Sequence, residues 1–149
     1  MTTDPAARAV AATYVNLPVA DLDRSKAFFR RLGFAFDPRF TDASATCLVL
    51  GPDHRVMLLT QARFRDFTPH PLVDAHRGTE VLIALQLGSR AEVDEVTELA
   101  MAAGGRDFRP VEDHGWMYGR AFQDPDGHIW EPFFMDIEAM QASMPESQP

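Results

Sequence analysis

The chain has 149 residues, 46% of them hydrophobic and 24% charged, and its 22 acidic and 14 basic residues give a formal net charge of −8. This length and composition are typical of one soluble globular domain with a core of its own. The negative charge argues against nucleic acid as a partner, because a phosphate backbone binds basic surfaces, and it is compatible with a neutral or cationic small ligand.

No stretch reaches the roughly 18 apolar residues that a membrane-spanning helix needs. Residues 1–12 include Asp4 and Arg8 and have no long apolar core, so they resemble neither a secretory signal nor a membrane anchor. Cys47 is the single cysteine, which excludes a disulfide or a cysteine metal site within one chain. We therefore expect a cytoplasmic protein that does not contact a membrane.

The first regular elements are a strand and a helix. Apolar and polar residues alternate over residues 13–19, which predicts a strand with one apolar face. Asp21 or Asp23 can cap a helix that continues to Leu32 and ends at Gly33. The apolar stripe of this helix predicts that it packs against a sheet.

Three shorter strands are predicted at residues 34–40, 45–50 and 55–60, with turn residues between them. Residues 61–79 then interrupt the pattern with prolines, histidines and aromatic side chains. A connection of this length without clear regular structure is either a linker between half-modules or a lid over a site.

The same order of elements returns in the second half of the chain. Alternation over residues 81–87 predicts a strand, and Ser89 and Glu92 form a capping box that begins a helix. Two glycines at 104–105 end this helix, and residues 106–111 are a plausible strand. A hairpin supplies the last two strands.

That hairpin turns at residues 124–127, where Pro125 presets φ and Gly127 tolerates φ > 0. If these four residues form the loop, Gln123 pairs with His128 and Arg120 lies opposite Glu131. Glu131 then shares a face with the apolar side chains of its strand, where an unpaired carboxylate is costly. We expect Arg120 and Glu131 to form a cross-strand ion pair, either as a support for the sheet or in the wall of a cavity.

Together these elements predict an α+β fold of tandem βαβββ modules, whose curved mixed sheet surrounds a cavity. As a single domain, it would have module one at about 13–60, the linker at 61–79, module two at about 80–134 and a C-terminal tail at 135–149, where 136–143 can form a short helix. Each helix covers one sheet face. The residues that point away from the helices would line a trough, the natural place for a ligand.

The chain resembles the vicinal oxygen chelate superfamily, which includes glyoxalase I, fosfomycin and bleomycin resistance proteins, and extradiol dioxygenases. The resemblance lies in residues 14–25, 28–29, 32–34, 103–105 and 124–127. These motifs span nearly the whole chain and are specific for the fold. They are not specific for a reaction, because the superfamily includes isomerases, oxygenases, thiol transferases and pure binders on one scaffold.

Members of this superfamily that use a metal typically take one ligand from each of four strands. The resemblance carries these positions onto Tyr14, Leu58, Leu82 and Glu131, where the family pattern has His, Glu, His and Glu. Leucine offers no lone pair, and a divalent ion needs about three or four nitrogen or oxygen donors in fixed geometry. Glu131 is the one family ligand position retained, so we expect no metal site and no cofactor.

The trough is expected to bind a small organic molecule through a mostly apolar wall with a few polar groups. Glu131 is the candidate proton acceptor and Tyr14 a candidate hydrogen-bond donor, and these two are the candidate catalytic residues. The other residues expected to line the trough are Asn16, Leu58, Thr60, Leu82, Ala84, Tyr118, Arg120 and Phe133. Arg120 could hold a carboxylate or carbonyl oxygen of the ligand. A polar cluster that fills a collapsed cavity would use the same residues.

Three functions remain open from the sequence. The first is a glyoxalase-like protein with a degenerate metal site that binds a small organic metabolite and, if it is an enzyme, transfers a proton as a lyase or isomerase does. The second is a metal-free, drug- or metabolite-sequestering protein of the bleomycin-resistance type. The third is a metal-dependent lactoylglutathione lyase or dioxygenase. The family resemblance also implies a homodimer.

Overall fold

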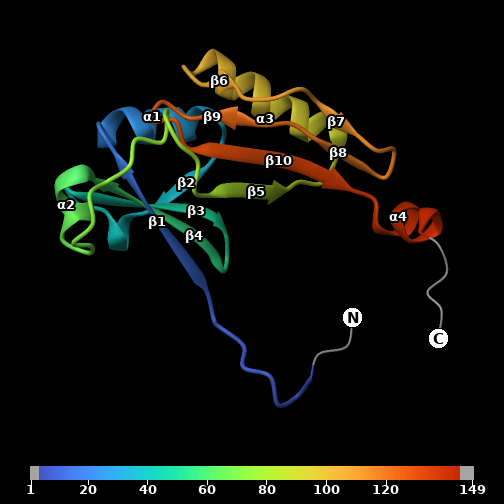
Figure 1. The fold of residues 1–149 in the computed structure, drawn as a ribbon, viewed down its shortest axis with the longest axis horizontal. Coiled ribbons are helices and arrows are strands. Elements are labelled where there is room, and N and C mark those ends of the chain that lie inside the picture. Colours follow the sequence, from blue (N-terminus) through green and yellow to red (C-terminus); the bar gives the residue numbers. More distant parts are fainter. Residues whose placement is uncertain (1–3, 145–149) are drawn as a thin grey trace. The chain divides into compact units, whose positions relative to one another are not determined.

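The computed structural model describes residues 4–144, and the chain divides into two compact units. The first unit contains the residues up to 26 and residues 34–71, and the second contains residues 27–33 and those from 72 onward. Each unit is built on a sheet of its own (Figure 1). The predicted α+β fold with tandem βαβββ modules is confirmed.

The first sheet is mixed, with the strand order β1-β4-β3-β2. Its strands are β1 (Thr13–Val19), β2 (Ala35–Asp37), β3 (Ala45–Gly51) and β4 (His54–Thr60), and short helices η1 (Pro38–Phe40) and α2 (Gln61–Arg65) follow β2 and β4. β1 runs parallel to β4, and the other neighbours are antiparallel. One face is apolar, and its Leu17, Val19, Leu48, Val56 and Leu58 side chains are buried.

Helix α1 (Leu22–Arg31) begins and ends as the sequence predicts. The side chain of Asp21 accepts a hydrogen bond from the backbone N–H of Arg24, and Gly33 adopts a φ of 97° just beyond the helix. The C-terminal half of α1 belongs to the second unit. There Phe28 packs near Phe122, and Phe29 packs edge-on against Trp130 with 4.9 Å between ring centroids.

The second sheet has the strand order β6-β9-β10-β8-β7, and β5 pairs in parallel with β10. Its strands are β5 (Leu82–Gln86), β6 (Arg106–Asp107), β7 (Glu112–Asp113), β8 (Met117–Gly119), β9 (Phe122–Gln123) and β10 (Ile129–Met135). Helix α3 (Arg90–Ala102) lies along one face of this sheet (Figure 1). The strand predicted at 106–111 is thus shorter than expected, and β7 forms beyond it.

Helix caps in the second unit follow the sequence. The hydroxyl of Ser89 accepts a hydrogen bond from the N–H of Glu92 at the start of α3, and Asp136 caps α4 (Ile137–Ser143) in the same way. Arg90, at the start of α3, forms an ion pair with Asp113 of β7 at 2.8 Å.

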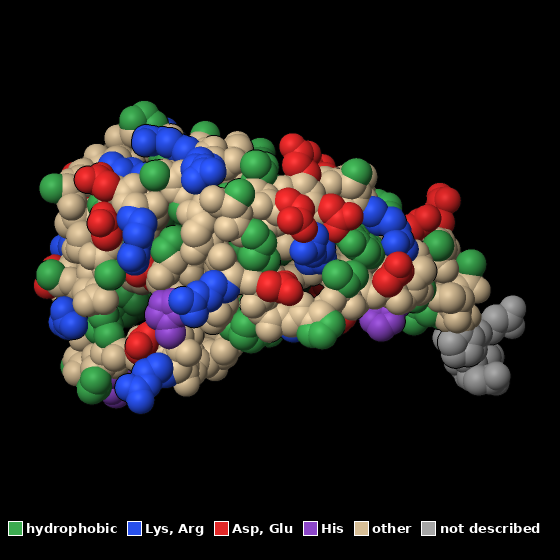
Figure 2. Space-filling model, turned by 90° about the horizontal axis from the view of Figure 1, so that it is seen from above, with side chains coloured by type: hydrophobic (Ala, Val, Ile, Leu, Met, Phe, Trp, Pro, Cys, Tyr) green, Lys and Arg blue, Asp and Glu red, His purple; other side chains and the backbone are tan. Residues whose placement is uncertain are grey.

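In the view from above, acidic and basic side chains are interspersed over the surface (Figure 2). No helix among the described residues is both long and apolar enough to cross a membrane.

The hairpin of β9 and β10 has a register one residue away from the predicted one. Gln123 pairs with Ile129 instead of His128, so five residues form the loop. The physical reason is Asp124, whose buried carboxylate accepts hydrogen bonds from the N–H groups of Asp126 and His128 and from Nε1 of Trp130. His128 is thereby held inside the loop, and each later residue of β10 shifts by one position.

Candidate functional site

Four of the predicted site residues share the face of the second sheet that lies away from α3. Ala84 of β5 is the partner of Glu131 in β10, Leu82 is the partner of Ile129, and Phe133 is two residues beyond Glu131. Partners in neighbouring strands, and alternate residues within a strand, have side chains on the same face. We call this the Glu131 face. Its β5 side is open, since Leu82 is 49% exposed and Ala84 is also exposed, whereas Ile129 of β10 is buried.

The carboxylate of Glu131 forms an ion pair with Nη1 of Arg109. The side chain of Glu131 is 16% exposed and that of Arg109 is 30% exposed, so the pair is partly shielded from water. Arg109 also lies 3.4 Å, through Nε, from a carboxylate oxygen of Glu112. A lone charge on an apolar face is costly, and Arg109 supplies the partner that Glu131 requires.

Sequence reasoning did not identify Arg109. It follows β6 in a short irregular stretch, 22 positions before Glu131, and no motif surrounds it. The one signal in the sequence is its position as a single charge in Phe108-Arg109-Pro110-Val111. An arginine in such an apolar stretch needs an acidic partner if it packs against a sheet.

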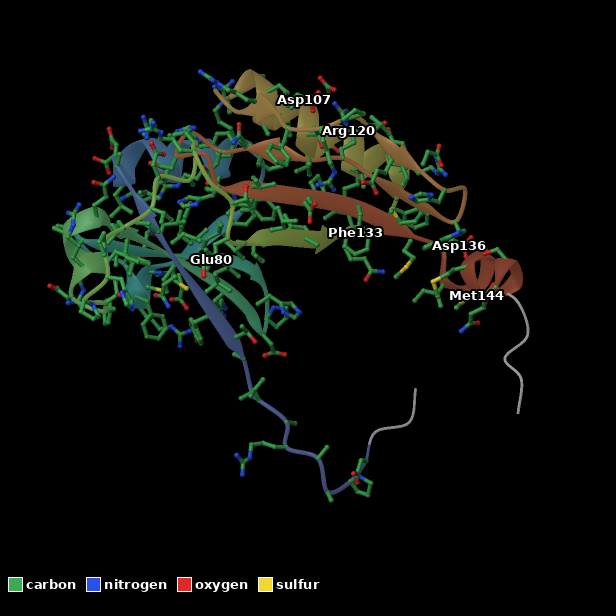
Figure 3. The ribbon with its side chains drawn as sticks, viewed as in Figure 1. Glu80, Asp107, Arg120, Phe133, Asp136 and Met144 are labelled. Carbon is green, nitrogen blue, oxygen red and sulfur yellow. The ribbon has the colours of Figure 1, made fainter. Side chains whose placement is uncertain are left out.

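Arg120 and Tyr118 lie on the other face of the second sheet, toward α3. Arg120 donates to Glu98 at 2.8 Å and to Asp94 at 3.3 Å, and the hydroxyl of Tyr118 donates to Asp94 at 2.6 Å. The predicted ion pair between Arg120 and Glu131 is therefore wrong. The shifted register explains this, because Arg120 lies opposite Pro132, to whose carbonyl it donates its backbone N–H, and no longer opposite Glu131. Neighbouring residues of a strand point to opposite faces, and Figure 3 shows Arg120 and Phe133 on opposite sides of β10.

The hydrogen bond to Asp94 also changes the chemistry of Tyr118. The Asp94 carboxylate accepts a hydrogen bond from the phenol hydroxyl and, together with burial, raises the pKa of Tyr118 above its usual value. This hydroxyl is consequently engaged in holding the sheet to α3. The second sheet brings neither Tyr118 nor Arg120 to the Glu131 face.

The predicted residues of the first unit also fall on two faces. Tyr14 pairs with Arg55 and Asn16 pairs with Met57, and both Tyr14 and Asn16 are exposed. Leu58 pairs with Leu17 on the opposite, apolar face and is completely buried. Thr60 ends β4, where its hydroxyl accepts a hydrogen bond from the N–H of Arg63 and caps α2. Tyr14 and Leu58 therefore cannot act as neighbouring ligand positions on one face, which corrects the alignment of the family positions.

The family positions do not fit a divalent metal. Leu58 is buried on the apolar face, Leu82 has no donor atom, and Glu131 is bound by Arg109. Such an ion needs about three or four converging donors. Over residues 4–144, no group of three or more His, Cys, Asp or Glu side chains is arranged to hold a metal ion.

Comparisons with known proteins agree with this fold. The family model of the Glyoxalase/Bleomycin resistance protein/Dioxygenase superfamily matches residues 11–131. Among curated proteins, no sequence matches this one.

Three solved structures with similar folds illustrate the match. A hypothetical protein, SA1046, from S. aureus is 24% identical, with a TM-score of 0.73, over 85% of this chain and 95% of that one. A glyoxalase-related enzyme from Fulvimarina pelagi is 24% identical, with a TM-score of 0.71, over 86% and 88% of the two chains. A bleomycin resistance determinant encoded on the transposon Tn5 is 23% identical, with a TM-score of 0.59, over 85% and 99%. At these identities the likeness establishes the fold, and the chain belongs to the Glyoxalase/Bleomycin resistance protein/Dioxygenase superfamily.

Proposed function

We propose that this protein binds a small organic molecule on the Glu131 face of the second sheet and that Glu131 accepts a proton from it. The observation that carries the proposal is the ion pair of Glu131 and Arg109 beside the exposed apolar residues Leu82 and Ala84. Ligand sites are typically apolar surfaces with a few placed polar groups. This face has that composition.

The pair supplies two complementary functions. An apolar part of the ligand would pack on Leu82, Ala84 and Phe133, which lie on the same face as Glu131. Arg109 would donate hydrogen bonds to a carbonyl or carboxylate oxygen of the ligand. Glu131 would then take a proton from the adjacent carbon, while Arg109 stabilises the negative charge that develops on the oxygen. This is proton transfer of the lyase or isomerase type.

No metal enters this proposal, because Leu58 and Leu82 have no donor atoms and Glu131 is bound by Arg109. We expect protein purified without chelator to contain far less than one divalent ion per chain. Elemental analysis by inductively coupled plasma mass spectrometry measures this directly. Near-stoichiometric nickel, zinc, manganese or iron would contradict the proposal and favour a metal-dependent lyase or dioxygenase.

The ligand can be found by thermal-shift screening against carbonyl metabolites and, separately, cationic drugs. We expect a compound that stabilises the wild type and loses this effect in both Glu131→Gln and Arg109→Gln. Arg120→Gln is the matched control, because Arg120 is a charged residue of the same sheet on the face toward α3. If the stabilisation survives in both test variants, the Glu131 face is not the binding site.

A second candidate function is sequestration without chemistry. It is supported by the two family ligand positions that carry leucines, Leu58 and Leu82, and by the fold shared with a bleomycin resistance determinant. A net charge of −8 suits a cationic guest. The two candidates are separated by incubating the stabilising compound with the protein and analysing it by mass spectrometry. Recovery of the unchanged compound favours sequestration, and conversion that is lost in Glu131→Gln favours proton transfer.

A further inference from the structure

The first sheet carries a charged cluster whose arginines and aspartate have no part in the function proposed for the Glu131 face. At its centre is Asp37, the last residue of β2, whose side chain is 7% exposed. Its carboxylate accepts hydrogen bonds from the backbone N–H, Nε and Nη2 of Arg39 at 3.0, 3.1 and 2.7 Å. It also accepts one from Nη1 of Arg55 at 3.0 Å. Two guanidinium groups therefore share one carboxylate.

The charges of this cluster do not balance. Among the described residues, Arg39 and Arg55 form ion pairs with the single carboxylate of Asp37, so two guanidinium groups and one carboxylate leave the cluster with a net charge of about +1. Arg55 is also close to the thiol of Cys47, at 4.0 Å from Nη1, but a neutral thiol does not compensate a charge. An excess positive charge on a partly buried surface is unfavourable unless an anion accompanies it.

One donor of the cluster is also unsatisfied. Nε of Arg55 is buried and has no hydrogen-bond partner among the described residues. A buried donor without an acceptor costs free energy, more so when it belongs to a charged group. The Arg55 side chain as a whole is 15% exposed and that of Arg39 is 72% exposed, so the cluster is accessible mainly through Arg39.

Tyr14 is next to this cluster. It is the cross-strand partner of Arg55 and is 47% exposed. The hydrogen bond and the charge of the Asp37 carboxylate raise the pKa of Arg39. Because Tyr14 and Arg55 are cross-strand neighbours, the phenol hydroxyl is a candidate neutral donor for an oxyanion bound there.

We propose that Arg39, Arg55 and Tyr14 form a binding site for one carboxylate group of a small organic anion. A monoanion brings the cluster to neutrality, and a movement of the exposed Arg39 side chain would let its oxygens accept from the buried Arg55 Nε. Guanidinium groups match the planar, two-oxygen geometry of a carboxylate. The site lies on the first sheet and uses none of the residues that form the Glu131 face.

The Nε–H groups of arginine give resolved signals in nitrogen–proton correlation spectra, so the proposed donor can be observed directly. We would titrate nitrogen-15-labelled protein with sodium benzoate, with the neutral analogue benzyl alcohol, and with sodium chloride at matched ionic strength. The signal that disappears in Arg55→Lys identifies Arg55. We expect this signal to shift saturably with benzoate and to stay in place with the other two. No saturable shift, or an equal shift with chloride, would overturn the proposal.

Variants test the two arginines separately. Arg39→Lys and Arg55→Lys keep the charge but lose the planar fork, so each should weaken benzoate binding about tenfold, the effect of one lost charge-assisted hydrogen bond. The matched control is Arg65→Lys, at an exposed arginine of α2 outside the cluster, and it should bind as the wild type does. Wild-type affinity in Arg39→Lys would refute the site even if Arg55→Lys fails to fold. Glu131→Gln should keep the response, which separates this site from the Glu131 face.

Discussion

Gly127, in the loop between β9 and β10, is the position where adding one methyl group should be most damaging. Its φ is +88°, a left-handed backbone conformation that residues other than glycine rarely adopt. A Cβ atom built there would also lie 2.7 Å from the backbone nitrogen of His76 and 2.9 Å from the carbonyl carbon of Ala75. Both are close backbone contacts, so Gly127→Ala would force the loop or the segment against it to move.

The two effects can be estimated separately. A left-handed conformation costs an L-residue about 1 to 2 kcal/mol. Forcing extra atoms into a packed site typically costs about 1 to 3 kcal/mol more. We therefore expect Gly127→Ala to lower the free energy of unfolding by about 2 to 5 kcal/mol, a large part of the stability of an ordinary domain.

Gly33 provides a matched control. Its φ is +97°, but a Cβ atom added there would have no heavy atom within 4 Å. Gly33→Ala should therefore show the backbone cost alone, about 1 to 2 kcal/mol. Urea unfolding followed by circular dichroism gives both values. Equal losses in the two variants would show that the close approach of residues 75–76 to Gly127 does not contribute, and our packing argument would be wrong.

Three further predictions address electrostatics and assembly. In a double-mutant cycle with Glu131→Gln and Arg109→Gln, we expect a coupling of about 0.5 to 1 kcal/mol in unfolding free energy, whereas additive effects would deny the ion pair. Arg90 and the N–H of Gly115 hold the pKa of Asp113 well below its usual 3.8. As the pH falls, the Asp113 carboxyl of the unfolded chain takes up its proton before that of the folded protein, so the stabilisation by Asp113 is present above about pH 4 and declines below it. The difference in urea midpoint between wild type and Asp113→Asn should therefore be smaller at pH 3 than at pH 7. A difference that does not change with pH would contradict this prediction. Finally, we propose that the protein is a homodimer, as the family resemblance implies. Light scattering coupled to size-exclusion chromatography should then give twice the mass of one chain, and a monomer at all concentrations would contradict this.

The order of elements was predictable because it depends on local sequence. Alternation over β1, the cap at Asp21, the N-cap at Ser89 and the glycine after α1 all act within a few residues, and each formed where expected. β6 and β7 were not resolved from each other, because two-residue strands have too few residues to show alternation.

Pairing between elements was harder to predict. The hairpin register depends on whether His128 belongs to the loop or to the strand, and the buried Asp124 decides this by binding the N–H of His128. One residue of difference moved Arg120 from the side of Glu131 to that of Asp94 and Glu98.

The candidate site was therefore only partly predictable. Ala84, Leu82, Phe133 and Glu131 share a face because their strands are parallel neighbours in a register that the sequence does not specify. The face of Leu58 was misjudged, since its partner Leu17 lies more than 40 residues away and sequence patterns do not give such pairings. Arg109 was missed for the same reason: its carboxylate partner is distant along the chain.

The contact between Asp124 and the indole of Trp130 provides a built-in optical probe. The Nε1–H of Trp130 donates to the Asp124 carboxylate at 3.0 Å, and the indole is fully buried, so its emission depends on a closed hairpin loop. The chain has two tryptophans, and replacing Trp116 by phenylalanine would leave Trp130 as the single emitter. Opening of the loop would then register as a red shift in fluorescence, which makes the mobility of this hairpin measurable without labels.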